Sequence, residues 1–297
     1  MKLAAIDIGS NAIRLQVSKV LTSADQVIFK KLEYVRFPLR LGQDVFSEGS
    51  ISDASQQRFV KLMRAYKLLI DLYEVNSFMA VATSAMREAS NGQELVDAVA
   101  ADSGIQIEVI DGQKEAEMIN DAIYSYIGTG PSLHIDVGGG STELNLYVKH
   151  EKIKSESFPI GSVRRLKHHD KPEIWQEMQD WVARHVIKEY KKVQAVGTGG
   201  NINKIYEIGS NRHRLGKTKK ISIDQAREVI EYIKGFSIEE RESALQLNPD
   251  RADVILPASD IYLSIMDWAG AKSITVPDVG LKDGIMQHLY RTRETPQ

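Results

Sequence analysis

The chain has 297 residues, enough for two domains of ordinary size at roughly 150 residues each. Its 42% hydrophobic and 26% charged residues are typical of a globular protein with packed cores. The net charge of -2 argues against a dedicated nucleic-acid binder, and the absence of cysteine excludes disulfides, thiolate catalysis and thiolate metal sites.

No apolar run approaches the ~18 residues that a membrane span needs. The apolar stretch before Asp7 is also too short for the core of a signal peptide. We therefore expect a soluble, cytoplasmic protein with no membrane partner and no nucleic-acid partner.

Strand-like and helix-like segments alternate along the first half. Strands are predicted over 3–6 and 15–20, on either side of a glycine turn, which indicates a β-hairpin. Seven apolar residues with helical spacing predict a helix over 53–75, namely Phe59, Leu62, Met63, Tyr66, Leu69, Ile70 and Tyr73. Further strands are predicted over 78–82 and 105–110, with helices beginning after Asn91 and after Gly112.

The second half begins with the same pattern. It contains predicted strands over 133–137, 143–148, 153–158 and 193–196, and predicted helices over 172–190 and after Gly200. Capping boxes at 222–225 and 237–240 are expected to open two more helices. A last strand ends at 276–280, before a final helix. We expect domains over 1–128 and 129–297, with a C-terminal helix at about 285–297 that could pack back on the first.

A nine-residue motif occurs twice. Residues 6–14 read IDIGSNAIR and residues 135–143 read IDVGGGSTE, and aligning Asp7 with Asp136 gives an offset of 129 residues. Ile6, Gly9 and Leu15 then match identical residues of the second half. A repeat of this length, opening each half between two predicted strands, indicates a duplicated domain.

Each turn has residues suited to a charged ligand. Glycines let backbone N–H groups point together into an anion-binding nest, and the neighbouring hydroxyls can add donors. Asp7 and Asp136 would repel phosphate directly, but they are suited to Mg²⁺, which bridges carboxylates to phosphate oxygens. For a single copy, a tight hairpin closed by an Asx turn explains the residues equally well. Two copies with matching acids favour the ligand-binding interpretation.

Two other phosphate motifs are excluded. A dinucleotide fingerprint starting at Gly138 would need glycine at position 143, where the chain has Glu143. Residues 216–218, Gly-Lys-Thr, resemble the end of a P-loop, but that motif needs glycine at position 211, which is Asn211.

Seven motifs, in order and spanning the chain, resemble those of one family. They are AAIDIGSNAIRL (4–15), VATSAMREASN (81–91), VIDGQKEAEMI (109–119), HIDVGGGSTEL (134–144), FPIGSVR (158–164), VGTGGNINKI (196–205) and VPDVGLKDGIM (276–286). Together they resemble the exopolyphosphatase/guanosine pentaphosphatase (Ppx/GppA) family of the actin/sugar kinase/heat-shock chaperone superfamily. The resemblance implies an α/β fold of two duplicated ribonuclease H-like (actin-like ATPase) domains, with the active site in a cleft between them.

The resemblance also implies roles for particular residues. Glu115 matches the general base that activates water in relatives, and Lys114 replaces a second acid that family members often have. Without the resemblance, Glu115 would be an ordinary solvated helix residue. Arg87 resembles an arginine that contacts substrate phosphates, and Ala12 stands where relatives commonly have serine. One phosphate contact could therefore be missing.

The candidate site residues fall into three groups. Those expected to hold a metal, Mg²⁺ or Mn²⁺, are Asp7, Asp136 and Glu143, the last of which has Arg14 as its counterpart in the first half. Those expected to bind phosphate are Gly9, Ser10, Asn11, Arg14, Arg87, Gly138, Gly139, Gly140, Ser141 and Thr142. The third group, Gly197, Thr198, Gly199 and Gly200, stands where the superfamily has its adenosine-binding loop, although such a turn can also serve packing.

Two further features remain open. The basic run 211–220 could guide a polyanion, but a solvated loop is the more frequent explanation. A homodimer is compatible with the sequence without being indicated by any motif.

The favoured function is Mg²⁺-dependent release of terminal orthophosphate from inorganic polyphosphate. Guanosine pentaphosphate (pppGpp) is the alternative substrate for the same machinery. A small-molecule kinase would differ in needing both ATP and an acceptor, and a nucleotide-dependent regulatory protein would lack turnover. The expected base and the metal-side acids argue against the regulatory protein. The sequence stops at Gln297, soon after the GLKDG element, whereas longer family members add a helical region, so processive action on long polymers is not expected.

Overall fold

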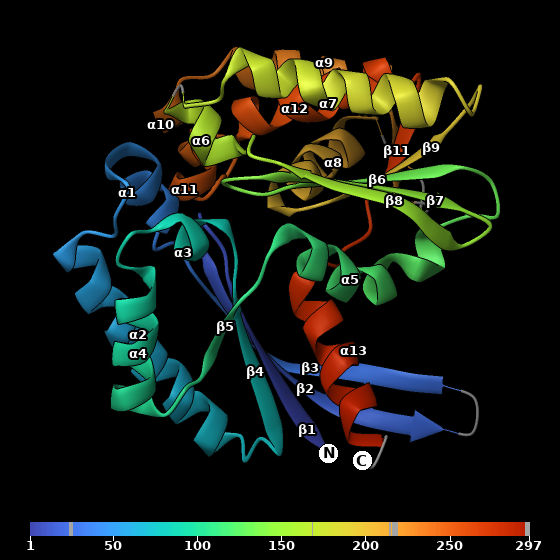
Figure 1. Ribbon diagram of the computed structural model, residues 1–297. Helices are drawn as coiled ribbons and strands as arrows, with labels where there is room; N and C mark the ends of the chain where they lie inside the picture. The colour runs from blue at the N-terminus through green and yellow to red at the C-terminus, as the bar shows by residue number, and fades with distance from the viewer. Residues whose placement is uncertain (24–25, 168, 214, 216–218, 295–297) are drawn as a thin grey trace. The chain divides into compact units, whose positions relative to one another are not determined.

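The computed structural model describes residues 1–23, 26–167, 169–213, 215 and 219–294 (Figure 1). The chain forms two compact units: unit 1 is Met1–Ala122 with Gly280–Gln297, and unit 2 is Ile123–Val279. Within the described ranges no helix is long and apolar enough to cross a membrane. The basic run at 211–220 and the Gly-Lys-Thr segment at 216–218 lie partly or wholly outside these ranges.

Unit 1 is built on a five-stranded sheet in the order β3-β2-β1-β4-β5. Strands β1 (Lys2–Ile8), β2 (Ile13–Ser23) and β3 (Gln26–Phe37) are antiparallel neighbours, while β4 (Ser77–Ala82) and β5 (Ile107–Val109) run parallel to β1. Alternating side chains of β1 therefore face opposite sides of the sheet.

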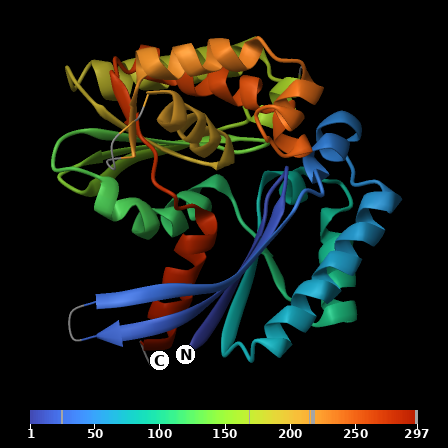
Figure 2. The ribbon, with the colours of Figure 1, turned by 180° about the vertical axis from the view of Figure 1, so that it is seen from behind.

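Helices cover both faces of this sheet. Figures 1 and 2 show α2 (Asp53–Leu72) and α4 (Gly92–Ser103) on one face and α13 (Leu281–Glu294) on the other. The apolar stripe predicted for α2 is confirmed, since Phe59, Met63 and Tyr66 are fully or almost fully buried. Leu281, Ile285, Met286 and Leu289 of α13 pack in one cluster with Leu3 and Ala5 of β1. The shorter helices are α1 (Leu41–Glu48), α3 (Ser84–Glu88) and α5 (Gly112–Ile123).

Unit 2 is built on a six-stranded sheet in the order β10-β11-β9-β6-β7-β8. Its strands are β6 (Ser132–Val137), β7 (Thr142–Val148), β8 (Glu151–Phe158), β9 (Gln194–Thr198), β10 (Lys220–Ser222) and β11 (Ser273–Thr275). The order β8-β7-β6-β9-β11 repeats the order and directions of β3-β2-β1-β4-β5, with β10 added at the edge. The predicted duplication is thus present in the topology.

Six helical segments of unit 2 contribute buried residues to one hydrophobic core with its sheet (Figure 1). They are α7 (Pro172–Val182), the π-helical η2 (Ala183–Ile187), α8 (Gly200–His213), α9 (Ile223–Lys234), α11 (Pro249–Ala252) and α12 (Ile255–Trp268). The shorter segments are η1 (Tyr124–Tyr126), α6 (Ser162–Leu166) and α10 (Ile238–Ser243). Leu133, Ile135 and Val137 of β6 share a core with Ile261 and Ile265 of α12. Both predicted capping boxes, at Ser222 and Ser237, are formed.

Candidate active site

The two copies of the motif form the same hairpin. In unit 1, Asp7 pairs with Arg14 and Ile8 with Ile13 across β1 and β2. In unit 2, Asp136 pairs with Glu143 and Val137 with Thr142 across β6 and β7. All four residues of each set keep the offset of 129, so the sequence repeat is also a repeat of register.

The turns are closed in the same way. The Gly9 amide donates to the Ala12 carbonyl at 3.2 Å, and the Gly138 amide donates to the Ser141 carbonyl at 2.9 Å. A Cβ atom added at Gly9 or Gly138 would lie 3.2 Å from that same carbonyl oxygen. Neither glycine has a positive φ. Glycine is needed at these two positions for close approach of the backbone and not for a left-handed conformation.

A second repeated segment leads into the residues that hydrogen-bond to the carbonyls of each turn. The sequence Phe-Pro-Leu at 37–39 and the sequence Phe-Pro-Ile at 158–160 both follow the third strand of their unit. The Leu39 amide donates to the Phe37 carbonyl at 3.0 Å, and the Ile160 amide donates to the Phe158 carbonyl at 2.7 Å. This second repeat was not predicted, although both copies can be read in the sequence.

In unit 1 this segment binds the carbonyls of the turn. The Gly42 amide donates to the Ser10 carbonyl at 2.8 Å, and the Arg40 amide donates to the Asn11 carbonyl at 3.0 Å. Because a trans peptide directs its N–H opposite to its C=O, the amides of Asn11 and Ala12 point away from this segment.

Unit 2 uses the same arrangement on its triple-glycine turn. The Ser162 amide binds the Gly138 carbonyl at 3.0 Å, the Val163 amide binds the Gly139 carbonyl at 2.8 Å, and Arg164 Nε binds the Gly140 carbonyl at 2.8 Å. The amides of residues 139, 140 and 141 therefore point together, away from α6. Consecutive N–H groups with one direction are what an anion site needs.

Gly161 explains how the segment comes so close. A Cβ atom at this position would lie 2.5 Å from the Gly139 carbonyl carbon and oxygen and from the Gly140 nitrogen. Those are backbone atoms that cannot move aside alone. Only glycine therefore fits at position 161.

The two hairpins differ in charge at one paired position. Arg14 Nη1 donates to Asp7 Oδ2 at 2.6 Å, so unit 1 places a cation directly beside its strand-end acid. In unit 2 the register partner of Asp136 is Glu143, and both side chains lie on the same face of the sheet. Asp7 was predicted as a metal ligand together with Asp136 and Glu143, and the structure shows that its charge is already balanced by Arg14.

Glu143 is buried and its carboxylate is held by two hydroxyls. Glu143 Oε1 accepts from Ser141 at 2.7 Å and from Ser157, on the neighbouring strand β8, at 2.9 Å. Two donors on one oxygen fix the orientation of the carboxylate. Ser157 was not among the predicted site residues.

These two acids fit a hard cation. Mg²⁺ is usually held by one or two carboxylates, while its other ligands are waters and substrate phosphates. Among the described residues no group of three or more acidic or histidine side chains could hold a metal ion. Asp136 and Glu143, opposite one another at the sheet's end, match the smaller donor set that Mg²⁺ requires.

Glu115 lies in the first turn of α5, half-buried. Its amide donates to the Asp111 carbonyl at 3.0 Å, while the Asp111 side chain accepts from the Lys114 amide at 2.8 Å and so begins the helix. Lys114 forms an exposed ion pair with Glu108 at 3.5 Å, which accounts for its charge. Glu115 therefore belongs to the first turn of a helix that begins three residues after the end of β5.

The GLKDG motif, at the start of α13, packs directly against α5. A Cβ atom on Gly284 of α13 would lie 2.0 Å from the Met118 carbonyl of α5, so the two helices touch through their backbones. Asp283, one residue earlier, accepts from Gln16 of β2 and from the Gly280 amide. The motif thus fixes α5, and with it Glu115, against the rest of unit 1.

The other predicted phosphate-binding residues of unit 1 lie near its turn or beside α5. The hydroxyls of Ser10 and Ser84 share a hydrogen bond of 2.8 Å, which joins the turn to the start of α3. Arg87, in the last turn of α3, donates from Nη1 to the Ile110 carbonyl at 2.6 Å, just before α5. Arg87 is exposed, so the remainder of its guanidinium can meet solvent or ligand.

Several predicted residues of unit 2 serve its interior. The Thr142 hydroxyl donates to the Ile160 carbonyl at 2.6 Å and is fully buried. A Cβ atom on Gly197 would lie 2.5 Å from the Ile274 side chain. The Thr198 hydroxyl hydrogen-bonds to His134 Nε2 at 2.9 Å. These contacts show packing roles, whereas Gly199 lies just before α8 and Gly200 is its first residue.

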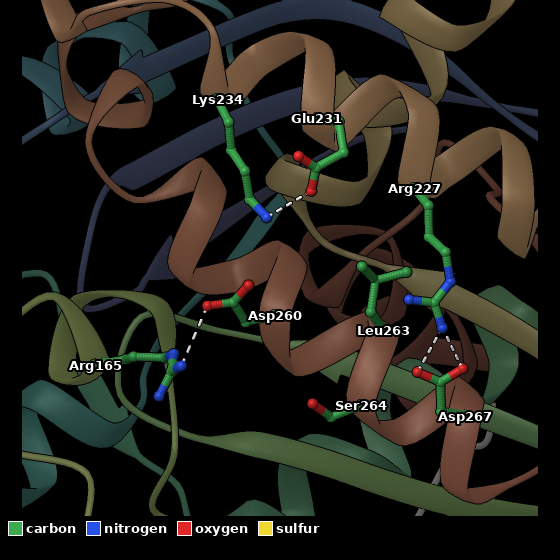
Figure 3. Close-up of a pocket in the computed structure, with 8 residues that line it drawn as sticks. All are labelled: Arg165, Arg227, Glu231, Lys234, Asp260, Leu263, Ser264 and Asp267. Carbon is green, nitrogen blue, oxygen red and sulfur yellow. Dashed lines mark hydrogen bonds and ion pairs between the residues drawn. The ribbon is translucent and has the colours of Figure 1, made fainter.

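A surface pocket of about 470 Å³ lies elsewhere on unit 2, along α9 and α12 (Figure 3). It contains three cations, each joined to a carboxylate: Arg227 to Asp267, Lys234 to Glu231 and Arg165 to Asp260. None of its lining residues was predicted for the site. Its balanced charges give it no preference for a polyanion.

Comparison with known proteins identifies the family. The model of the Ppx/GppA phosphatase family matches residues 20–292. The chain belongs to this family. The crystal structure of the Aquifex aeolicus family member covers 100% of this chain and 99% of its own, with a TM-score of 0.77 and 25% identity. The expected α/β fold of two duplicated actin-like domains is thereby confirmed.

The curated relatives differ in length. Exopolyphosphatase 2 of Mycobacterium tuberculosis is 27% identical, and the match covers 96% of this chain and 97% of that protein. The guanosine-5'-triphosphate,3'-diphosphate pyrophosphatase of Aeromonas hydrophila is 24% identical over 96% of this chain but 59% of that protein. The chain spans 44% of the bifunctional 3-dehydroquinate synthase/phosphatase of Fusobacterium nucleatum, to which it is 27% identical over 93% of its own length.

Proposed function

We propose that this phosphatase-family chain is an exopolyphosphatase, which releases terminal orthophosphate from inorganic polyphosphate with Mg²⁺ or Mn²⁺. The observation that carries the proposal is the duplicated turn with unequal charges. One copy offers backbone amides beside two acids, Asp136 and Glu143, and the other offers amides beside the Arg14 guanidinium. Backbone amides and a guanidinium bind phosphate oxygens, and paired acids can bind a cation that accompanies phosphate.

The residues have separate parts in this proposal. The amides at 139–141 and the Arg14 and Arg87 guanidiniums would bind phosphate oxygens. Asp136 and Glu143 would hold the metal ion, which when bound neutralises charge on the phosphate group. Asp7 would serve to orient Arg14 through their ion pair, and not to bind the metal ion directly.

Hydrolysis needs only one proton acceptor. Glu115 would take a proton from a water molecule as the water oxygen bonds to the terminal phosphorus. The bond from that phosphorus to the bridging oxygen breaks, and orthophosphate leaves a chain shorter by one phosphate. The protein then contributes mainly positioning and charge stabilisation, as is usual for phosphoryl transfer.

The alternative substrate is pppGpp, whose terminal phosphate would be removed by the same steps. Proteins named for both activities are similar to this chain, exopolyphosphatase 2 at 27% identity and the Aeromonas protein at 24%. The proposal includes a cytoplasmic location and a homodimer.

The test is orthophosphate release from long polyphosphate, short polyphosphate and pppGpp, each with and without Mg²⁺. We expect Mg²⁺-dependent release, with a higher kcat/KM for polyphosphate than for pppGpp. Preference for pppGpp would favour the alternative. Product formation that requires ATP and an acceptor would contradict both.

A further inference from the structure

The two units end their central parallel ladder differently. In unit 1 the register of β1 and β4 continues to Ile8 and Ala82, and the next amide, Thr83, donates to the Ile8 carbonyl at 3.1 Å. In unit 2 the register of β6 and β9 ends at Asp136 and Thr198. Val137 is the counterpart of Ile8, so unit 2 lacks one pair that unit 1 has.

Tyr262 of α12 occupies the place of that pair. Its hydroxyl accepts from the Val137 amide at 3.3 Å and donates to the Thr198 carbonyl. A parallel ladder joins an amide and a carbonyl of neighbouring strands directly. Here a phenol oxygen stands between them, so both backbone groups are satisfied while the strands separate.

Gly199 follows the end of β9 and has a φ of 115°, a backbone angle that residues with a side chain rarely adopt. A Cβ atom at Gly199 would lie 3.2 Å from the Tyr262 hydroxyl and 3.4 Å from Asp136 Oδ1. The loop before α8, the Tyr262 hydroxyl and the Asp136 carboxylate therefore meet within one small region of unit 2.

Tyr262 is suited to a permanent hydrogen-bonding role. It is 2% exposed, and burial, together with the charges of Asp136 and Glu143, raises the pKa of its phenol well above 10.0. The neutral hydroxyl can donate and accept at once, which its two backbone partners require.

We propose that Tyr262 is a positioning residue, whose hydroxyl separates the ends of β6 and β9 and so sets the spacing between the Asp136 carboxylate and the loop at Gly199. Its kinetic consequence rests on the proposed function. Without the hydroxyl, the two strand ends can close by one ladder bond, as in unit 1, and the loop shifts towards Asp136.

The first test compares Tyr262→Phe with a matched control, Tyr66→Phe. Tyr66 is also buried on a helix, and its hydroxyl donates to the Ile13 and Val35 carbonyls of unit 1 at 3.1 and 3.4 Å. Both variants lose one buried hydroxyl with backbone partners.

We expect Tm to fall by a similar amount in both variants. Only Tyr262→Phe should raise the Mg²⁺ concentration for half-maximal activity, by roughly tenfold, which is the order expected for the loss of one buried hydrogen bond. The KM for polyphosphate should change less than kcat.

Replacing Tyr262 by 4-aminophenylalanine restores a group that can donate and accept, and it should recover most of the Mg²⁺ response. An unchanged Mg²⁺ response in Tyr262→Phe would overturn the proposal. A Tyr262→Phe chain that is unfolded at room temperature would overturn it too, because the hydroxyl would then serve folding alone.

Amide hydrogen exchange provides a readout that does not depend on activity. In Tyr262→Phe the exchange rates of the backbone amides should change at residues 137–141 and 198–201, while those of β7 and β8 stay as in the wild type. A uniform change across unit 2 would contradict positioning. If the wild-type chain released no phosphate, the proposed function would fail, while this experiment would still decide the role of Tyr262.

Discussion

Arg14 Nη1 lies 2.6 Å from Asp7 Oδ2 across a register pair of β1 and β2, and the same register pair of β6 and β7 is Asp136 with Glu143. One hairpin therefore pairs an acid with a cation at this position, and the other pairs two acids. Two acids side by side repel one another unless a cation joins them. The two copies of the turn therefore differ in charge at this register position.

Arg14→Gln tests the first of these copies. Asp7 is 5% exposed, and removing its cation leaves a buried carboxylate without that partner. We expect a loss of unfolding free energy of about 1–3 kcal/mol and a higher KM for polyphosphate. Urea denaturation and steady-state kinetics measure both effects.

The control is Lys2→Gln, which removes a more exposed ion pair with Glu74, at 3.6 Å. Such pairs contribute less than about 1 kcal/mol, so stability and KM should hardly change. Equal effects in the two variants would show that Arg14 is an ordinary ion-pairing residue.

Ser157→Ala tests the second copy. The substitution removes one of the two hydroxyls that hold Glu143 Oε1, without touching the acid itself. We expect the Mg²⁺ concentration for half-maximal activity to rise several-fold, since the carboxylate loses part of its orientation. Ser155→Ala is the matched control: it lies on the same strand but donates to Asn145, at 2.6 Å. The same Mg²⁺ response in both would argue against Glu143 as a metal ligand.

Gly161→Ala tests the support of the triple-glycine turn. The new methyl group would collide with the backbone of Gly139 and Gly140. We expect a loss of about 1–3 kcal/mol of stability and a clear loss of activity, because the turn must shift. Gly130→Ala meets no atom within 4 Å and should change stability by less than about 1 kcal/mol. Thermal unfolding and phosphate release check the pair.

His134 gives the stability of the protein a dependence on pH. Burial, with a smaller contribution from Lys152, lowers the pKa of His134 from 6.5 to about 3. Between these values the unfolded chain takes up a proton that the folded chain excludes. Stability therefore falls as pH falls from 6.5 towards 3, by up to about 1.4 kcal/mol per pH unit.

His134→Gln should remove this contribution and give a flatter pH dependence. Urea unfolding of both proteins at about pH 7 and about pH 5 measures the difference. Parallel curves for the two proteins would mean that His134 takes up its proton equally in the folded and unfolded chains, which would contradict the lowered pKa.

Local patterns predicted much of the fold. The stripe of α2 and the capping boxes at Ser222 and Ser237 involve residues close in sequence, and all three features are present. The edge strand β3 was not predicted, because most of its side chains are exposed or half-buried and give no clear alternation. Helix α1 was missed with it, and α12, which is apolar on most of its surface, was not recognised either.

The candidate site was only partly accessible from the sequence. The offset of 129 residues locates both turns, but the supporting segments at Phe37 and Phe158 are 121 residues apart. The difference of eight residues arises because β2 and β3, with 11 and 12 residues, are each four residues longer than β7 and β8, with 7 and 8. A single offset therefore cannot align both features. Tyr262 lies 125 residues from Val137 in sequence, and no local pattern points to their contact.

The most direct test of the account is orthophosphate release from polyphosphate by the wild-type chain and by Glu115→Gln, with Mg²⁺ present. The variant keeps the size of the side chain but cannot accept a proton in the same way. We expect wild-type release, a fall of roughly 10²-fold or more in kcat for the variant, and nearly unchanged binding of polyphosphate to both. Full activity of Glu115→Gln would contradict the assignment of the base, and absence of release by the wild type would contradict the proposed function itself.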